Sequence, residues 1–250
     1  MTPRTPKTIR WSPQQADFLK FAQEENGSCV LEAVAGAGKT TTILEAACTM
    51  RGGVAILAFN KKIADEIKGK LAERGVDFRK AEAGTVHSFG FRAFRKTFEH
   101  VRLDEEKVPG MVDLALPPEW DHLRSGIVTL IGLAKQAAIG VLTAIDSLPA
   151  WMHLADHHDV FGDVDQDEDF DLAAIVAFCI RMLRENNREP GRVDYDDMVY
   201  LPLVHRVRFW RYDVVMIDEA QDTNGAQRAL VRALVRPGGR VIAVGDARQA

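Results

Sequence analysis

Hydrophobic residues follow two alternating patterns along the chain. Short continuous apolar runs are separated by stretches in which apolar residues recur every three or four positions. Continuous runs are typical of strands in a parallel sheet covered on both faces, and the wider spacing predicts amphipathic helices. The predicted strands are Cys29–Ala33, Val54–Phe59, Asp213–Ile217 and Arg240–Val244, with another short strand ending near Thr85. The pattern therefore predicts an α/β fold, a parallel sheet with helices on both faces.

Helical spacing begins directly after Ser12 and Pro13, where serine suits a helix N-cap and proline suits the first turn. The apolar positions of the predicted helices are Phe18, Leu19 and Ala22; Ile43, Ala46, Ala47 and Met50; Ile63, Ile67 and Leu71; and Leu230, Val231 and Leu234. The second of these helices follows a strand and a glycine-rich loop, so the order at that point is strand, loop, helix.

The alternation of strands and helices stops between Phe98 and about Pro190. Two apolar stripes at helical spacing lie there: Ile127, Leu130, Ile131, Ala134 and Ala138, then Leu172, Ile175, Val176, Cys179 and Leu183. The segment is too long for a connecting loop. We therefore predict a sheet domain in two parts, residues 1–98 and 191–250, with a mainly α-helical subdomain inserted at residues 99–190.

Composition indicates a globular protein, since 46% of the 250 residues are hydrophobic and 27% are charged. That balance supplies enough apolar material for a sizeable core. No stretch approaches the roughly 18 apolar residues of a membrane span, and no apolar run follows the basic amino terminus. Cys29, Cys48 and Cys179 are too far apart for a C-x-x-C pair and suit a reducing compartment. We expect a cytoplasmic protein without a membrane partner.

The net charge of −4 argues against a surface coated in cations for indiscriminate nucleic-acid binding. Eight acidic residues and no lysine or arginine fall between Ala155 and Asp171, and such a run repels phosphate and predicts a solvated loop. Side chains with metal-binding atoms in and beside it are His153, Asp156, His157, His158 and Asp159. Because they lack a defined ligand spacing, we predict no zinc site there.

The loop after the first predicted strand lies within LEAVAGAGKTTT, which has nearly the residues of a phosphate-binding loop. Backbone N–H groups near Gly36 and Gly38 would close on phosphate, and the ammonium of Lys39 would reach the outer phosphates. The Thr40 hydroxyl would ligate Mg²⁺. Ala33 departs from the usual pattern G-x-x-x-x-G-K-[ST], which has glycine there. The predicted nucleotide-binding residues of this loop are Ala33, Val34, Ala35, Gly36, Ala37, Gly38, Lys39, Thr40 and Thr41.

An acidic pair, Asp218 and Glu219, follows the apolar strand in VVMIDEAQD. Asp218 is placed to hold Mg²⁺ through water, and Glu219 to act as general base to the water that attacks a γ-phosphate. Another strand ends in VIAVGDARQA, and Asp246 and Gln249 would reach the same crevice at the carboxyl ends of parallel strands. We expect Gln249 to hydrogen-bond the γ-phosphate or the attacking water. The predicted catalytic residues are Lys39, Asp218, Glu219 and Gln249, and the predicted metal ligands are Thr40 and Asp218.

Five short motifs follow one another along the chain: AVAGAGKT, LAFNKKIADEI, TVHSFG, IDEAQD and VGDARQA. With these motifs the sequence resembles superfamily 1 DNA helicases of the UvrD/Rep kind, and it looks like their first RecA-like domain with its inserted helical subdomain. The resemblance spans about Trp11 to Ala250 and is weakest in the insertion. In that family the phosphate loop commonly reads A-x-A-G-x-G-K-T, so Ala33 fits it. The resemblance implies ATP and Mg²⁺ as cofactors and a bacterial or phage-like protein that acts at the nucleoid.

By this resemblance, Gln15 corresponds to the glutamine that reads the adenine edge, because an amide offers both a donor and an acceptor. An alternative is a capping box. Gln15 occupies the third helical position after Ser12, from which its side chain can reach back to the Ser12 backbone.

The resemblance also implies contacts to single-stranded DNA from Phe59, Asn60 and Lys61, where a ring can stack on a base and a cation can hold phosphate. The alternative for Phe59 is that its ring is buried in the core and does not contact DNA. A second motif implies DNA contacts from Thr85, His87, Ser88 and Phe89, with hydroxyls and imidazole bonded to phosphate oxygens. The alternative for His87 is that its imidazole makes a local hydrogen bond within the protein and does not contact DNA.

The segment VDYDDMVYLPL, Val193–Leu203, resembles the one that precedes the acidic strand in UvrD-like enzymes. Asp194 and Asp197 equally suit the first turn of a helix, where carboxylates cap N–H groups. Capping is the favoured interpretation.

The sequence stops at Ala250, after the third ATPase motif, so we expect the second RecA-like domain of the family to be absent. In the family that domain supplies arginines to the ATP site, and arginine fingers contribute about 10³ to 10⁵ in rate. We expect the chain alone to bind ATP, to hydrolyse it weakly or not at all, and to need that domain in cis or in trans.

The implied parent activity is ATP-driven movement along single-stranded DNA, 3′ to 5′, with single/double-strand junctions as partners. An alternative function is a non-catalytic, ATP-responsive DNA-binding or regulatory module. A transporter or recombination motor is disfavoured, because the first would need an ABC signature and the second gives no reason for TVHSFG or the insertion.

Overall fold

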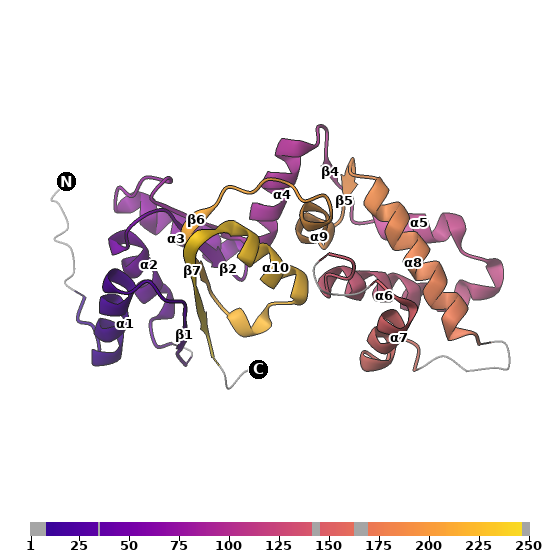
Figure 1. Cartoon of the computed structure of the whole chain (residues 1–250), viewed down its shortest axis with the longest axis horizontal. Helices are drawn as coiled ribbons and strands as arrows, with labels where there is room; N and C mark the ends of the chain where they lie inside the picture. The colour runs from indigo at the N-terminus through magenta and orange to yellow at the C-terminus, as the bar shows by residue number, and fades with distance from the viewer. Residues whose placement is uncertain (1–8, 35, 142–145, 163–169, 247–250) are drawn as a thin grey trace. The chain divides into compact units, whose positions relative to one another are not determined.

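The computed structural model describes residues 9–34, 36–141, 146–162 and 170–246 (Figure 1). The chain divides into two compact units. The first unit comprises Met1–Gly84, Tyr212–Asp222 and Val235–Ala250, and the second comprises Thr85–Arg211 and Thr223–Leu234. Chain segments that are remote in sequence therefore meet inside each unit.

The first unit is built on a five-stranded parallel sheet with the strand order β1-β7-β6-β2-β3. Its strands are β1 (Cys29–Glu32), β2 (Val54–Ala58), β3 (Ala81–Thr85), β6 (Tyr212–Ile217) and β7 (Val235–Gly245). The strands are flanked by helices, and the predicted RecA-like α/β class is confirmed. β7 begins earlier than predicted because Val235 pairs with Tyr212, after which the register shifts before Val214 pairs with Arg240.

The register of this sheet brings four strand ends together. Glu32 of β1 pairs with Gly245 of β7, while Ile217 of β6 pairs with Ala243 and with Leu57 of β2. Parallel strands that end level with one another deliver the loops that follow them to a single edge. The residues that directly follow β1, β6, β7 and β2 therefore leave the sheet at this edge.

Three helices of the first unit pack with the sheet around a single core. They are α1 (Pro13–Glu24), α2 (Lys39–Thr49) and α3 (Lys61–Glu73), and a short 3₁₀ helix, η2, spans Ala220–Asp222. Every residue of β2 is buried, as predicted for a strand without polar positions. The core joins buried side chains of the helices, such as Phe18, Ile43 and Ile67, to those of β2, β6 and β7.

The second unit is mainly helical. Its elements are α4 (Val86–Thr97), β4 (Arg102–Leu103), α5 (Lys107–Ala115), η1 (Pro118–Leu123), α6 (Arg124–Gln136), α7 (Leu148–His157), α8 (Leu172–Arg188), β5 (Arg192–Val193), α9 (Asp197–Val204) and α10 (Gly225–Leu234). The two predicted apolar stripes lie mostly on α6 and α8, and most of their buried members share one core with Trp151 of α7.

The predicted insertion, residues 99–190, lies inside the second unit, which extends beyond it on both sides. Close packing explains the extension. A Cβ placed on Gly90 of α4 would come within 2.2 Å of the backbone oxygen of Met198 in α9, so only glycine allows this approach. Residues of α4 and α9 share one core with the helices between them. Residues 99–190 are therefore part of a larger unit, and a distinct inserted subdomain stays a prediction.

The acidic run differs in part from the predicted solvated loop. Helix α7 continues to His157, so the first residues of the run are helical. The helix continues that far because Ala155 is buried in the core of the unit. Residues 163–169 of the run, and the predicted site residues Ala35 and Gln249, lie outside the described residues.

None of the helices in the described part of the chain has the length and apolar character needed to cross a bilayer. Within the same residues, no group of three or more histidine, cysteine, aspartate or glutamate side chains is arranged to hold a metal ion. Cys29, Cys48 and Cys179 are free thiols.

Candidate nucleotide-binding site

Two glycines of the loop between β1 and α2 have positive φ angles. Gly36 and Gly38 have φ angles of 78° and 79°, a region that side chains rarely adopt. Gly38 is the N-cap of α2 and has no side chain with which to cap it, so the first-turn N–H groups and the positive end of the helix dipole face the loop. The N–H of Ala33 donates to Gly245 O at 3.0 Å, which fixes the loop to β7.

Lys39, the first residue of α2, contacts the acidic end of β6 directly. Its Nζ lies 3.0 Å from Oε2 of Glu219 and 3.0 Å from Oε1. The two residues are 180 positions apart in sequence, and their side chains are only 10% and 27% exposed. The structure thus brings together two of the residues predicted to be catalytic.

Asp218 stands at the point where β6 leaves the sheet. Its N–H donates to Leu57 O at 2.9 Å, and its Oδ1 accepts from the N–H of Glu219 at 3.1 Å. Burial raises the pKa of Asp218, and the charge of Glu219 beside it raises that pKa further. A cation at this carboxylate would oppose both effects.

Gln221 contacts the predicted site residue Glu219 and was not itself predicted from the sequence. Its Nε2 donates to Glu219 Oε2 at 3.0 Å, and its Oε1 accepts from the N–H of Asp246 at 3.3 Å. This amide therefore links the ends of β6 and β7. A Cβ at Gly245 would lie 2.4 Å from Oε1 of Gln221, so a larger residue there would displace this amide. The sequence signal that could have identified Gln221 is its amide, two residues after Glu219 in DEAQD.

The hydrogen bond from Gln221 lowers the pKa of Glu219, burial opposes this effect, and Lys39 lowers the pKa further. Glu219 also has a φ of 49°, which is uncommon for a residue with a side chain. Glu219 is thus a carboxylate held ionised, in a defined position, beside the phosphate loop.

The oxygen donors at this edge suit Mg²⁺. This ion is usually held by one or two carboxylates together with waters and substrate phosphates, so a protein cage of three or more ligands is not needed. Asp218 supplies a buried carboxylate, and Thr40 follows Lys39 in the first turn of α2. Both residues are predicted metal ligands, and their oxygen atoms are of the donor type that Mg²⁺ takes.

Gln15 forms the capping box that the sequence allowed. Its Oε1 accepts from Ser12 N at 2.9 Å, and its own N–H donates to Ser12 Oγ at 3.2 Å. The same amide also donates from Nε2 to Ala37 O and to Thr42 Oγ1, each at 3.1 Å. Gln15 thus joins α1 to the phosphate loop. To read an adenine edge it would have to exchange one of these bonds.

The residues after β2 emerge at the same edge as the phosphate loop. Phe59 is 59% exposed, so its ring is not part of the core. Asn60 caps α3 by accepting from Ile63 N at 2.9 Å, and Lys61 begins that helix on the surface. An exposed ring beside a cation is suited to a base and its phosphate.

The TVHSFG motif begins α4 in the second unit. Thr85 caps the helix by accepting from Ser88 N at 3.2 Å, and the Ser88 hydroxyl donates to Thr85 O at 2.8 Å. Burial lowers the pKa of His87, so its imidazole is neutral near pH 7. Phe89 is only 3% exposed, which leaves its ring little surface to offer a base.

Asp194 and Asp197 lie at the start of α9, in the second unit. Asp194 Oδ1 accepts from Asp197 N at 2.7 Å, the capping-type bond favoured from the sequence. Asp197 is also fully buried, 2.9 Å from Nζ of Lys107 and 2.8 Å from Nζ of Lys135. Burial opposes ionisation, but the two lysines lower the pKa of Asp197 overall. This buried network is a structural feature that the sequence did not reveal.

A glycine-rich loop before a helix, an acidic strand end beside it and a strand between the two define a RecA-like nucleotide-binding domain. Residues 11–250 match the UvrD/REP helicase N-terminal domain, and the chain belongs to this family.

Similar proteins support the assignment to this family. The chain is 23% identical over 256 residues to the ATP-dependent DNA helicase Rep of Escherichia coli, an alignment that covers 95% of this chain and 36% of Rep. It is 33% identical over 111 residues to the ATP-dependent DNA helicase UvrD1 of Mycobacterium tuberculosis, covering 38% of this chain and 14% of UvrD1. The chain therefore spans about a third of the length of the Rep relative.

Proposed function

We propose that this chain is the ATP-binding motor domain of a DNA helicase or translocase. The observation that supports this most directly is the contact between Lys39 and Glu219 at the edge where β1 and β6 end. A lysine at a phosphate loop and an ionised carboxylate beside it are the groups that hold a γ-phosphate and activate water.

In this proposal Lys39 leaves Glu219 when a triphosphate binds, and its ammonium pairs with the outer phosphates. Glu219 is then free to accept a proton from the attacking water, and Gln221 keeps its carboxylate in place through the bond at 3.0 Å. Asp218 and Thr40 would hold Mg²⁺, which supplies charge neutralisation on the phosphates when bound. Gln15, through its bonds to Ala37 and Thr42, would couple α1 to occupation of the loop.

We further propose that efficient turnover requires groups from a second RecA-like domain. Among the described residues, no arginine pairs with Asp218 or Glu219, and arginine fingers contribute about 10³ to 10⁵ in rate. Alternate closure and opening of two such domains would move the protein along single-stranded DNA, in the 3′ to 5′ direction. Phe59, Asn60 and Lys61 follow the end of β2, which pairs with the end of β6, and they would contact the single-stranded DNA.

Equilibrium binding of a fluorescent ATP analogue with Mg²⁺ tests the proposal. Lys39→Ala should weaken binding about tenfold or more, because it removes a charge-assisted hydrogen bond to phosphate. Lys70→Ala is the matched control, since Lys70 is a lysine of α3 paired with Glu66 on the surface. Unchanged affinity in the Lys39 variant would refute the nucleotide site. ATP binding without turnover, even with the second domain supplied, would favour an ATP-responsive DNA-binding module.

A further inference from the structure

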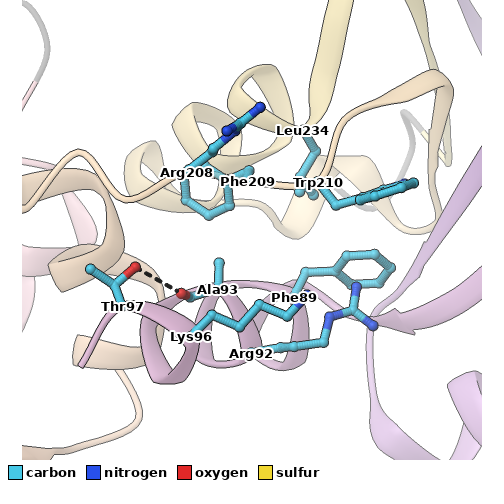
Figure 2. A pocket seen from close by; sticks show the side chains of 9 residues that line it. All are labelled: Phe89, Arg92, Ala93, Lys96, Thr97, Arg208, Phe209, Trp210 and Leu234. Carbon is cyan, nitrogen blue, oxygen red and sulfur yellow. Dashed lines mark hydrogen bonds between the residues drawn. The ribbon is translucent and has the colours of Figure 1, made fainter. Parts of the chain in front are cut away.

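Helix α4 presents one face to a cavity of about 340 Å³ in the second unit (Figure 2). The helix contributes Phe89, Arg92, Ala93, Lys96 and Thr97, which recur at the spacing of a single helical face. The opposite wall consists of Arg208, Phe209, Trp210 and Leu234. All nine lining residues belong to the second unit.

The cavity has an apolar floor and a cationic, aromatic rim. Phe89, Ala93 and Leu234 are buried, whereas Lys96 and Arg208 are exposed and Trp210 is 70% exposed. None of the nine lining residues is acidic. Lys96 and Arg208 make no hydrogen bond or ion pair with another described residue, so both charges are available to an anionic ligand.

Two of the remaining polar groups are already engaged. The guanidinium of Arg92 lies 4.8 Å from the centroid of the Phe89 ring, and the Thr97 hydroxyl donates to Ala93 O at 3.3 Å. In Figure 2 the rings of Phe89 and Trp210 extend toward the same end of the cavity, from opposite walls. The groups left for a ligand are thus two cations and one exposed indole.

The sequence of this wall alternates basic and aromatic residues. The segment RVRFWR, residues 206–211, places three arginines around Phe209 and Trp210, in a chain whose net charge is −4. Basic residues interleaved with exposed rings are typical of surfaces that bind single-stranded nucleic acid, where cations follow the backbone and rings stack on bases. This segment lies outside the five motifs of the family resemblance.

We propose that this cavity binds one nucleotide of a single-stranded nucleic acid. The Trp210 indole stacks on the base, while Lys96 and Arg208 hold the phosphates on either side of it. The choice of nucleic acid as the ligand rests on the proposed function. The site itself is separate from the nucleotide-binding loop and from Phe59, Asn60 and Lys61.

An acidic peptide with an apolar anchor is the competing ligand, because it would use the same two cations. The exposure of Trp210 favours the nucleic acid. A peptide anchor would occupy the apolar floor and leave the indole at the rim in water, whereas a stacked base covers the face of that ring.

The test measures binding of a labelled oligothymidylate to the whole chain by fluorescence anisotropy, without ATP, over a series of salt concentrations. Trp210→Ala should weaken binding about tenfold, and Trp210→Phe should retain most of the affinity. Arg208→Ala and Lys96→Ala should each lower the salt slope by about 0.7, the contribution of one phosphate contact on a single strand. Phe78→Ala is the matched control, because Phe78 is 69% exposed with Arg79 5.7 Å from its ring but lines neither site.

The proposal is overturned if Trp210→Ala binds the oligonucleotide as the parent chain does, or if Phe78→Ala causes an equal loss. It is also overturned if an aspartate-rich peptide with one aromatic residue binds through Trp210 while oligonucleotide affinity is independent of that residue. If Phe59→Ala weakens oligonucleotide binding and Trp210→Ala does not, the proposed function stands and this site fails. ATP affinity, measured separately on the Lys39 variant, reports on the motor site alone.

Discussion

Lys39 and Glu219, which are 180 residues apart in sequence, form a two-pronged ion pair with Nζ 3.0 Å from each carboxylate oxygen. The pair connects the start of α2 with the end of β6. It also places the Lys39 ammonium beside Glu219, the proposed general base. When a triphosphate binds, Lys39 would pair with its phosphates and leave Glu219. The base would therefore be released only when a triphosphate is present.

Glu219→Gln should retain ATP binding and abolish turnover, because an amide is similar in shape but does not accept a proton from water. Loss of one general base typically costs about 10² to 10⁴ in rate. The measurement compares phosphate release with analogue binding, in the chain supplemented with a second RecA-like domain. The control is Glu66→Gln, which alters an exposed glutamate of α3. Hydrolysis that persists in the Glu219 variant would show that another group acts as base.

Gln221→Ala should raise the pKa of Glu219 toward its ordinary value, because the bond from Gln221 is the main cause of the lowered pKa. A lowered carboxyl pKa stabilises the fold at pH values above the unfolded pKa, and this stabilisation is lost as pH falls through the folded pKa. For Glu219 the loss therefore begins below about pH 4.5 in the parent chain.

NMR titration of the Glu219 side-chain carboxyl carbon measures this shift, and Glu189, whose pKa is lowered by Arg192 in the second unit, serves as an internal reference. The Glu189 midpoint should not move. An unchanged Glu219 midpoint would mean that Lys39 alone keeps the carboxylate ionised.

Phe59→Ala should weaken binding of single-stranded DNA more than binding of duplex, because base faces are available for stacking only in the unpaired strand. The expected loss is about 1–3 kcal/mol for a single strand. Phe78→Ala again provides an equally exposed aromatic control. Equal losses for single-stranded and duplex DNA would indicate that the ring supports the local fold and does not stack on a base.

Asp197→Asn should destabilise the second unit strongly, because it leaves Lys107 and Lys135 buried without the carboxylate that both contact. Removal of one partner from a buried ion pair typically costs about 3–5 kcal/mol. The matched control is Asp65→Asn, since Asp65 pairs with Lys68 on the surface at 3.3 Å with both side chains 53% exposed. An exposed pair contributes about 0–1 kcal/mol.

Urea denaturation monitored by tryptophan fluorescence measures the change, because Trp151 lies in the core of the same unit. Similar unfolding free energies for the two variants would mean that water or another group compensates the buried lysines.

Much of the nucleotide site follows from local sequence. The continuous apolar runs of β2 and β6 specify buried parallel strands, and a strand, a glycine-rich loop and a helix in succession are typical of an anion-binding turn, because these preferences act over a few residues. The sequence predicted that Lys39 and Thr40, at the start of the helix after β1, would lie at the same edge as Asp218 and Glu219, which follow β6, since parallel strands present their carboxyl ends at one edge. The capping box of Gln15 was one of two alternatives that the sequence left open.

The sequence by itself thus determined the α/β class, the strand ends that carry the site and the family to which the chain belongs. Only the tertiary structure decided which partners those residues take. Gln221 joins two strand ends, and Asp197 meets lysines 90 and 62 positions before it, because packing sets contacts between segments that no local pattern relates. Packing also decided that Phe59 is exposed and Phe89 is buried. A phenylalanine can lie in the core or on the surface, and only the neighbouring elements determine which.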